Sequence, residues 1–543
     1  MSQSIVQVAL DLPLDKNFDF FAPDASGEDI GRLAVVPFGN KFFSGVIVGV
    51  SANSAVAHDK LKRVKLIQRA LPRFSAGDFA LIHFCQNYYH HPFGPIALGG
   101  LPPAMRVTRL VVPKTDRVVT ITAAGREALK SIAAGAVAQR AMLEAVEHAA
   151  QSVAALRARH ARAAAILQTL LAKGWVASHE LATDSPLPGV QGRARMMLSG
   201  PALNGEQSAA ASGIIAKLGT FAPFLVSGIT GSGKTEVYLQ VIAAALNFGH
   251  QALVLMPEIN LTPQFLRQLE TRFPGANIVQ QHSGLADLPR LSGYLDANSG
   301  RADIVIGTRL AVFTPLPRLG VIIVDEEHDA SFKQQEGFRY SARDVAVFKA
   351  QQAACPVVLG SATPSLESLQ NVSRGRFHEM KLTQRAAPNA VLPRIEFIDL
   401  NHERAADGLS ATLVKALEET VRRGEQALVF INRRGYSPAL VCAHCGWMPE
   451  CRRCSARLVF HQRERRLKCH HCGYQARVPA ICGDCGSHEL VPAGQGTERI
   501  ETALRAQLPA ARIARVDRDS TRKRGSAGCS WRAASTAWVM NAR

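Results

Sequence analysis

Residues 228–235 carry a pattern that binds phosphate groups. The segment reads Gly-Ile-Thr-Gly-Ser-Gly-Lys-Thr and matches G-x-x-x-x-G-K-[ST] at every fixed position. Lys234 would reach the β- and γ-phosphates of a nucleotide, and Thr235 would hold Mg²⁺. Glycines let the backbone N–H groups of such a loop point at phosphate oxygens. The residues expected to surround the phosphates are Gly228, Gly231, Ser232 and Gly233. The segment predicts an ATP and Mg²⁺ site in which Lys234 is catalytic.

A second group of chemically active residues follows an apolar run about ninety positions later. Residues 321–324 read Val-Ile-Ile-Val and lead into Asp325, Glu326, Glu327 and His328. We expect Asp325 to bind Mg²⁺ beside the glycine loop and Glu326 to orient or deprotonate the attacking water. An acidic run after a strand is common on protein surfaces, but after a glycine loop it indicates nucleotide hydrolysis.

Both groups must be positioned by a common framework of strands. Apolar runs recur at residues 224–226, 252–256, 304–306, 321–324 and 357–359, separated by helix-favouring or loop segments. Buried strands that alternate with helices predict a parallel sheet covered on both faces. Ligands of such sheets bind at the carboxyl ends of the strands, where both polar groups fall.

Eight cysteines between residues 442 and 485 are spaced as metal ligands. They form four C-x-x-C pairs, which are Cys442 and Cys445, Cys451 and Cys454, Cys469 and Cys472, and Cys482 and Cys485. Two such pairs complete one tetrahedral ion, so four pairs predict two structural zinc sites with four thiolate ligands each. Pairing in sequence order would have to close one site across five residues. Nested pairing, with the second and third pairs inside, is easier.

The composition favours a nucleic-acid partner. The 543 residues contain 63 Lys and Arg against 44 Asp and Glu, a formal net charge of +19, which favours nucleic acid first and an anionic membrane second. No apolar run reaches the roughly 18 residues of a membrane span, and the first residues do not resemble a signal peptide. We therefore expect a cytoplasmic, nucleoid-associated protein with no membrane partner.

Two further modules are expected before the nucleotide-binding part. Short β-rich runs between residues 4 and 70, separated by turn signals, indicate a small, mostly β domain. Residues 123–174 are alanine-rich and helix-favouring, and a strand-like segment follows them. This order would suit a winged-helix module, although a plain helical spacer fits nearly as well. Residues 185–203 carry Pro and Gly and indicate a linker.

The motif order resembles that of superfamily-two helicases, and the detail resembles one family among them. The stretches that resemble the primosomal protein N′ (PriA) family are 253–264, 282–285, 325–329, 333–340 and 432–436. This resemblance implies an ATP-dependent 3′-to-5′ DNA helicase that recognises stalled or D-loop-type forks and initiates replication restart by primosome assembly. It also implies that forked DNA, single-stranded DNA, primosome proteins and single-stranded-DNA-binding protein are partners. We expect a monomer.

The resemblance also assigns roles to residues outside the glycine loop. Gln207 would read adenine, and the resemblance favours nested cysteine pairing. Phe338, Arg339 and Tyr340 resemble an aromatic-rich loop that couples DNA contact to hydrolysis, and base stacking is worth about 1–3 kcal/mol per base. Polar neighbours of the two rings argue against core packing. The residues that resemble a pocket for the 3′ end of a nascent strand are Phe18, Asp19, Gly39 and Lys62.

Together these observations predict a multidomain protein. Its expected parts are a 3′-end-binding β domain (1–108), a winged-helix-like domain with linker (109–198), an ATP-binding RecA-like α/β lobe (199–393), an incomplete second RecA-like lobe (394–441 and 486–525), a zinc insert (442–485) and an aberrant tail (526–543).

The tail is where the resemblance fades. Residues 526–543 contain no acidic residue and two of the four tryptophans, which we interpret as a change of reading frame or a premature end. The arginine pair that reaches the γ-phosphate in the family would then be missing. Since an arginine finger is worth roughly 10³–10⁵ in rate, we expect very slow ATP turnover, with strands left unpaired in the second lobe. The alternatives are a motor-dead fork-binding fragment and an unrelated P-loop DNA-dependent ATPase with a zinc ribbon.

Overall fold

The computed structural model contains two compact units, Met1–Ala390 and Val391–Arg543. It describes residues 4–111, 117–132, 136–147, 151–153, 156, 163–180, 197–257, 263–386, 394–400, 402–403, 405, 408–431, 439–454, 457–461, 466–469, 472–493, 497–509, 511–516 and 536–541. Of the predicted features, most of the linker, the motif residues 258–262 and 432–436, and the tail up to residue 535 lie outside these ranges.

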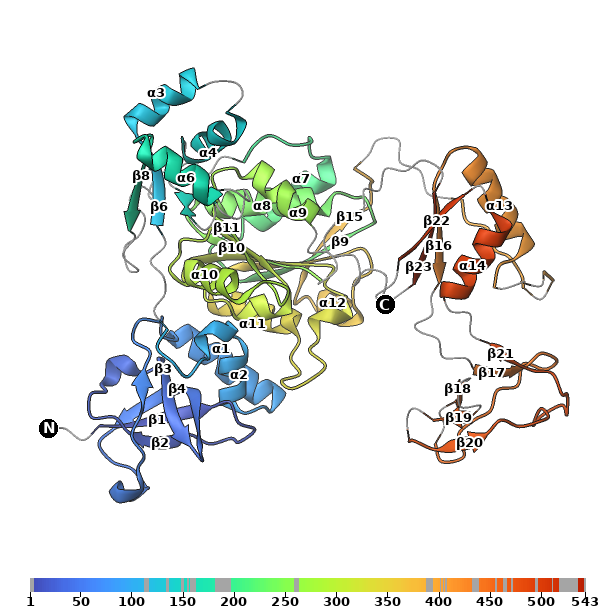
Figure 1. Ribbon diagram of the computed structural model, residues 1–543, viewed down its shortest axis with the longest axis horizontal. Helices are drawn as coiled ribbons and strands as arrows, with labels where there is room; N and C mark the ends of the chain where they lie inside the picture. The colour runs from blue at the N-terminus through green and yellow to red at the C-terminus, as the bar shows by residue number, and fades with distance from the viewer. Residues whose placement is uncertain are drawn as a thin grey trace. The chain divides into compact units, whose positions relative to one another are not determined.

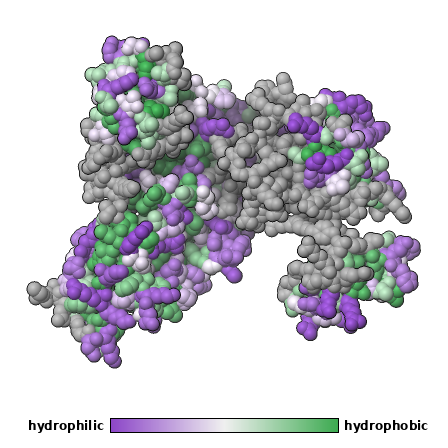
Figure 2. Space-filling view, viewed as in Figure 1, coloured by the Kyte–Doolittle hydropathy of each residue, from purple (hydrophilic) through white to green (hydrophobic). Residues whose placement is uncertain are grey.

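The first unit begins with an antiparallel sheet in the order β2-β1-β4-β3-β5, followed by two helices (Figure 1). The elements are β1 (Ile5–Leu10), β2 (Phe18–Phe21), β3 (Leu33–Phe38), β4 (Lys41–Ser51), β5 (Leu66–Ile67), α1 (Ala76–Tyr89), α2 (Phe93–Gly99) and the short helix η3 (Pro103–Met105). Alternating apolar side chains such as Val6 and Val8 point into a core of their own. The predicted mostly β domain is confirmed, and hydrophilic side chains line its outer edge (Figure 2).

A smaller module follows, with a three-stranded antiparallel sheet in the order β7-β6-β8. Its elements are β6 (Arg117–Ile121), α3 (Ala123–Ser131), α4 (Val137–Glu147), β7 (Gln151–Ser152), α6 (Ala163–Ala172) and β8 (Val176–Glu180). Leu143, Leu167 and Leu170 lie in its separate buried core. Three helices packed with a small sheet fit the winged-helix-like interpretation and not a plain helical spacer.

The nucleotide-binding part is a seven-stranded sheet, parallel in every pair, in the order β11-β12-β10-β13-β14-β9-β15. Its strands are β9 (Ala222–Gly228), β10 (Gln251–Leu255), β11 (Ile278–Gln281), β12 (Ile304–Gly307), β13 (Leu319–Asp325), β14 (Pro356–Ser361) and β15 (His378–Leu382). Its helices are α7 (Gly205–Ile215), α8 (Lys234–Asn247), α9 (Pro263–Arg272), α10 (Asp287–Asn298), α11 (Ala342–Gln352) and α12 (Leu366–Ser373). The predicted parallel sheet is confirmed.

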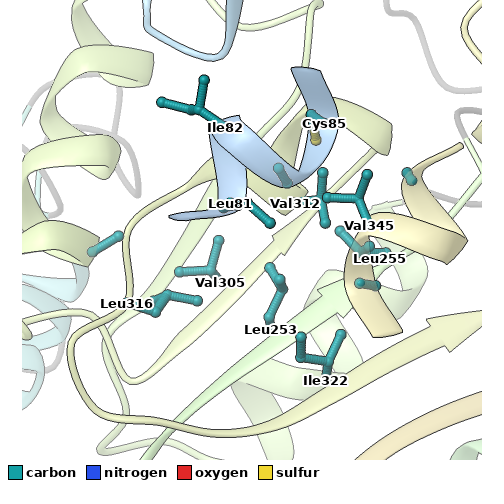
Figure 3. Close-up of a cluster of buried hydrophobic side chains, with 14 of the residues drawn as sticks. Leu81, Ile82, Cys85, Leu253, Leu255, Val305, Val312, Leu316, Ile322 and Val345 are labelled. Atoms are coloured by element: carbon teal, nitrogen blue, oxygen red, sulfur yellow. The ribbon is translucent and has the colours of Figure 1, made fainter. Parts of the chain in front are cut away.

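Residues of the central strands alternate between two buried cores, as a sheet covered on both faces requires. Val254 and Ile323 face the core shared with α7, α8 and α9, whereas Leu253 and Ile322 face the opposite core. On that second face, Leu81, Ile82 and Cys85 of α1 pack into the same cluster as Leu253 and Ile322 (Figure 3). A helix of the N-terminal module therefore completes the core of the nucleotide-binding sheet.

The second unit contains a three-stranded parallel sheet in the order β16-β23-β22. Its elements are α13 (Ala411–Arg422), β16 (Ala427–Ile431), α14 (Thr497–Gln507), β22 (Arg512–Val516) and β23 (Thr536–Asn541). The strand β23 comes from the segment that we expected to be an aberrant tail. The expectation that strands of the second lobe are left unpaired is corrected on the sides where β23 pairs with β16 and β22, whereas their outer edges have no partner strand among the described residues.

The zinc insert lies between β16 and α14 in the chain and forms its own antiparallel sheet in the order β20-β19-β18-β17-β21. Its strands are β17 (Ala439–Cys442), β18 (Val459–His461), β19 (Arg466–Lys468), β20 (Gln475–Arg477) and β21 (Leu490–Ala493). Within the residues described above, none of the helices combines the length and apolarity needed to cross a bilayer.

The close approach of α2 to β1 depends on Gly94. A Cβ atom at this position would lie 1.8 Å from the carbonyl oxygen of Leu10, whereas a Cβ at Gly99 of the same helix would meet nothing within 4 Å. We expect Gly94→Ala to reduce the free energy of unfolding by about 1–3 kcal/mol, because the backbone of α2 or β1 must move to make room for the added methyl group. The matched control Gly99→Ala should stay within about 1 kcal/mol of the wild type. Thermal unfolding midpoints check this, and equal midpoints would contradict the packing.

Candidate functional site

The glycine loop joins the end of β9 to the start of α8, as the sequence predicts. Gly231 and Gly233 have φ angles of 80° and 79°, a region that residues with a Cβ atom rarely adopt. A Cβ at Gly228 would lie 2.5 Å from Oγ of Ser232. The amino end of α8 therefore opens toward the loop, where its free N–H groups favour an anion.

Lys234 lies at the centre of this loop. Its Nζ donates a hydrogen bond of 3.0 Å to the carbonyl oxygen of Gly228. The Ser232 N–H donates to the Ile229 carbonyl at 3.0 Å, and Thr235 follows Lys234 in the first turn of α8. The one hydrogen bond described for Lys234 thus goes to a backbone carbonyl group, and no carboxylate accepts from it among the described residues.

The strand β13 brings Asp325 to this loop. Tyr238 of α8 donates a hydrogen bond of 3.1 Å to Oδ1 of Asp325. Burial raises the pKa of Asp325, the charge of Glu326 raises it further, and Tyr238 and Lys234 act in the opposite direction. Since Tyr238 lies one turn after Lys234 in α8, its bond to Asp325 brings the glycine loop and the acidic strand end to one site, as the sequence predicts.

Glu326 and His328 connect this site to the next strand. Glu326 has a φ of 49°, a strained backbone angle of the kind found at functional sites, and its Oε2 lies 3.6 Å from Nδ1 of His328. The same His328 nitrogen lies 2.7 Å from Oγ of Ser361, and Nε2 lies 3.3 Å from Oγ1 of Thr363. A movement of Glu326 can therefore be transmitted to the end of β14 through the contacts of His328.

Glu327 is a structural residue that the sequence analysis missed. Its side chain is fully buried and accepts hydrogen bonds from the N–H of Ser365 at 2.7 Å, from Oγ of Ser368 at 2.9 Å and from Nη1 of Arg343 at 3.1 Å. These donors lie at the starts of α12 and α11. Glu327 therefore anchors two helices beneath the acidic strand end. Only its place in the acidic run signalled a role.

Gln207 contacts the glycine loop directly. It is 4% exposed, its Nε2 donates to the Ser232 carbonyl at 2.8 Å, and its Oε1 accepts from the Asn204 N–H at 2.9 Å. The contact with adenine stays a prediction, and one N–H of this amide is left for it. What the structure adds is a bond from Gln207 to the loop itself.

The predicted aromatic-rich loop is only partly exposed. Tyr340 is 2% exposed and packs against Phe313 and Phe338 at centroid distances of 5.0 and 4.9 Å. The expectation that Tyr340 is an accessible stacking ring is therefore corrected. The apolar surroundings include Tyr89 of α1, whose ring lies 5.6 Å from Phe338. Phe338 is half-buried and Arg339 is exposed, so DNA contact by these two stays a prediction.

The four residues expected at a 3′-end pocket lie together in the N-terminal sheet. Phe18 and Asp19 are on β2, and the backbone of Lys62 pairs with Phe21 of the same strand at 2.9 Å. The Phe18 ring lies 4.9 Å from that of Phe38, which precedes Gly39 in the turn between β3 and β4. The proximity of these four residues agrees with a shared pocket. Binding of a 3′ end at this pocket stays a prediction.

The eight cysteines form two clusters of four. The inner cluster is Cys451, Cys454, Cys469 and Cys472, and the outer cluster is Cys442, Cys445, Cys482 and Cys485, so the predicted nested grouping is the observed one. Sulfur pairs in them lie 3.5 to 3.6 Å apart. A tetrahedron with metal–sulfur bonds of about 2.3 Å places its sulfurs about 3.8 Å apart. The geometry fits zinc.

Family models match three parts of the chain. They describe a 3′DNA-binding domain (3′BD) at residues 7–102, a DEAD/DEAH box helicase at residues 206–372 and the PriA DNA helicase Cys-rich region at residues 451–477. The outer cysteine cluster lies beyond the third match. With the glycine loop and the acidic strand end at one site, these matches define the chain as an ATP-dependent DNA helicase with zinc-binding cysteines.

Whole-chain comparison narrows the class to one family. The replication restart protein PriA of Haemophilus influenzae is 39% identical over 532 residues, which cover 96% of this chain and 71% of that protein. The chain belongs to the replication restart protein PriA family. Proteins of the same name from Bacillus subtilis and Treponema pallidum are each 42% identical, over 306 and 321 residues. These matches span 38% and 48% of the two proteins, and 56% and 59% of this chain.

Two carboxylates near Arg343 should differ in how much they stabilise the fold. Glu327 is buried, whereas Glu367 lies 3.8 Å from the same guanidinium and is 70% exposed. We expect Glu327→Gln to lower the free energy of unfolding by about 1–3 kcal/mol, because buried donors lose an anionic acceptor. The control Glu367→Gln should change it by less than about 0.5 kcal/mol. Urea denaturation measures both, and a neutral Glu327→Gln would show that the network is dispensable.

Proposed function

We propose that this chain is the ATP-driven 3′-to-5′ DNA helicase motor of replication restart. The observation that supports it most is the hydrogen bond of 3.1 Å that Tyr238 donates to Asp325, because Tyr238 lies one turn after Lys234 in α8 and so joins the glycine loop to the end of β13. A cation on one side and a partly desolvated carboxylate on the other suit a magnesium triphosphate. Family membership argues against the unrelated P-loop ATPase.

Each residue of the site has a role in this proposal. Lys234 binds the β- and γ-phosphates, Thr235 and Asp325 hold Mg²⁺, and Glu326 orients the attacking water. When bound with ATP, Mg²⁺ neutralises charge on the phosphates. Tyr238 fixes the Asp325 carboxylate through its hydroxyl group, at 3.1 Å. Gln207 connects α7 to the glycine loop through its hydrogen bond to Ser232, and it binds adenine with its remaining N–H.

The DNA partners are forked and single-stranded DNA. The N-terminal module would hold a 3′ end with Phe18, Asp19, Gly39 and Lys62, and Phe338 and Arg339 would meet the strand at the motor. Primosome proteins and single-stranded-DNA-binding protein are further partners that the family resemblance suggests. We place the protein at the nucleoid of the cytoplasm on this basis.

The two cysteine clusters each hold one structural zinc ion. Four thiolates leave no open position for a substrate, so these ions stabilise the insert and take no part in hydrolysis. Cys445, Cys472 and Cys485 are exposed, which gives each site a path for metal entry.

Zinc removal tests the two sites separately from the motor. We expect two zinc ions per chain by elemental mass spectrometry, one ion after Cys451→Ser, and early proteolysis within residues 439–493 after chelation. Nucleotide binding at the glycine loop should persist. The control Cys355→Ser, at a buried cysteine outside the clusters, should keep both ions. Retention of two ions by Cys451→Ser would contradict the assignment.

Substitution of Lys234 tests the motor. Lys234→Ala should abolish the slow DNA-stimulated ATP turnover that we expect of this chain, because a positioned charge on the transferred phosphate is lost. The control Lys217→Ala removes the same charge from an exposed position of the same lobe and should retain full turnover. Steady-state phosphate release with a forked substrate measures this. Fork binding by the wild-type chain without any turnover would favour the non-hydrolysing alternative instead.

A further inference from the structure

We propose that Arg106 and Arg290 form a binding site for a backbone phosphate of a DNA strand, where the N-terminal module meets the nucleotide-binding sheet. This inference rests on the proposed function, because it assigns a contact for the same DNA. The two arginines lie far apart in the sequence and belong to none of the motifs described above.

Packing brings the two side chains together. Arg106 directly follows η3, which packs against α10. Met105 of η3 and Leu291 and Tyr294 of α10 belong to one buried cluster. Arg290 precedes Leu291 and lies one turn into α10. Arg106 and Arg290 are therefore each adjacent in the chain to a residue of the same buried cluster, on two elements that contact each other.

Neither guanidinium has a counter-ion at bonding distance within the described ranges. Nε of Arg106 is buried and has no hydrogen-bond partner there. Burial lowers the pKa of Arg290, the positive charge of Arg106 lowers it further, and Asp287 on the same helix acts in the opposite direction. Two like charges thus lie close together, in partly desolvated surroundings that favour an added anion.

Three other arginines of this lobe with little exposed surface are paired with carboxylates. Arg272 bonds Glu236 at 2.6 Å, Arg301 bonds Asp296 at 2.7 Å and Arg343 bonds Glu327 at 3.1 Å. Removal of such a charge from water is unfavourable unless an anion compensates it. The contrast indicates that the partner of Arg106 and Arg290 comes from outside the chain.

The position of the pair selects a DNA phosphate among anions. The helix α10 begins shortly after the carboxyl end of β11, at the edge where open α/β sheets bind ligands. In the sheet order, β11 is five strands from β9, or about 24 Å at about 4.8 Å per strand. The ATP phosphates at the glycine loop are therefore out of reach. Guanidinium groups also match phosphate oxygens in shape and charge.

The test compares the salt dependence of fork binding by the full chain. The double variant Arg106→Gln with Arg290→Gln should bind a forked DNA with a single-stranded arm more weakly, and the slope of log K against log [salt] should fall by about 0.7–0.9 for one lost phosphate. The control removes two exposed arginines, Arg374→Gln with Arg376→Gln, which precede the amino end of β15 at the opposite edge. The control should keep the wild-type slope.

A thermal measurement separates binding from a structural role. Inorganic phosphate should raise the unfolding midpoint of the wild type more than that of the double variant. An unchanged salt slope would overturn the inference, and so would a double variant that is destabilised in phosphate-free buffer but binds DNA as the wild type does. If the wild type binds no fork at all, the proposed function fails first, and this inference fails with it.

Discussion

The contact between α1 and the nucleotide-binding sheet is the interaction on which the first unit depends. A parallel sheet needs apolar cover on both faces, and Leu81, Ile82 and Cys85 of the N-terminal module supply part of it (Figure 3). Full burial of a Leu or Ile side chain is worth about 1.5–3 kcal/mol. The N-terminal module therefore cannot leave the sheet without exposing its core, so DNA held by that module has a fixed relation to the motor.

The same contact reaches the predicted aromatic-rich loop. Tyr89, the last residue of α1, accepts a hydrogen bond from the N–H of Ser341 at 3.2 Å, and Ser341 caps α11. Burial raises the pKa of Tyr89. Next to it, the ring of His91 stacks on Phe338 at 5.2 Å. A DNA strand that displaced Phe338 would therefore disturb the contacts of both the N-terminal module and α11. Arg343 of α11 in turn bonds Glu327, next to the acidic strand end.

Asp325 and Glu327, at and just after the end of β13, have different roles. The Glu327 carboxylate is surrounded by donors, including Arg343, and can only hold helices in place. Asp325, two residues earlier, receives one hydroxyl donor, and burial raises its pKa. A carboxylate with so little compensation is suited to an added cation. The difference between the two residues is thus one of surroundings, since their side chains carry the same functional group.

Features whose chemistry is local could be predicted from the sequence. The glycine loop needs positive φ angles at Gly231 and Gly233, and only glycine adopts them readily. The C-x-x-C spacing likewise identified the metal ligands in pairs. The short gap between the first two pairs favoured the nested grouping that is observed.

Features that depend on distant segments could not be predicted in this way. Tyr340 is buried because it packs against Phe313 and Phe338, in a cluster that also includes Cys85 of α1, about 250 residues earlier. The polar neighbours of Tyr340 in the chain gave no sign of that packing. The network of Glu327 and the proximity of Arg106 to Arg290 also arise from tertiary packing. So does the place of β23 between β16 and β22, for which the composition of the tail was a poor guide.

The outer cysteine cluster explains how a long insert can interrupt the second unit without disrupting its sheet. Cys442 and Cys485 are 43 residues apart in the chain, yet their sulfurs lie 3.6 Å apart. The neighbouring strands β17 and β21 pair from Ala439↔Ala493 to Cys442↔Leu490. The insert therefore leaves and re-enters at one narrow neck. A long loop is entropically unfavourable to close, and a metal ion bound by the four cysteines at its base would offset that cost by stabilising the closed form. With the neck closed, β16 and α14 can pack around Leu417, Val429 and Leu504 as if they were consecutive.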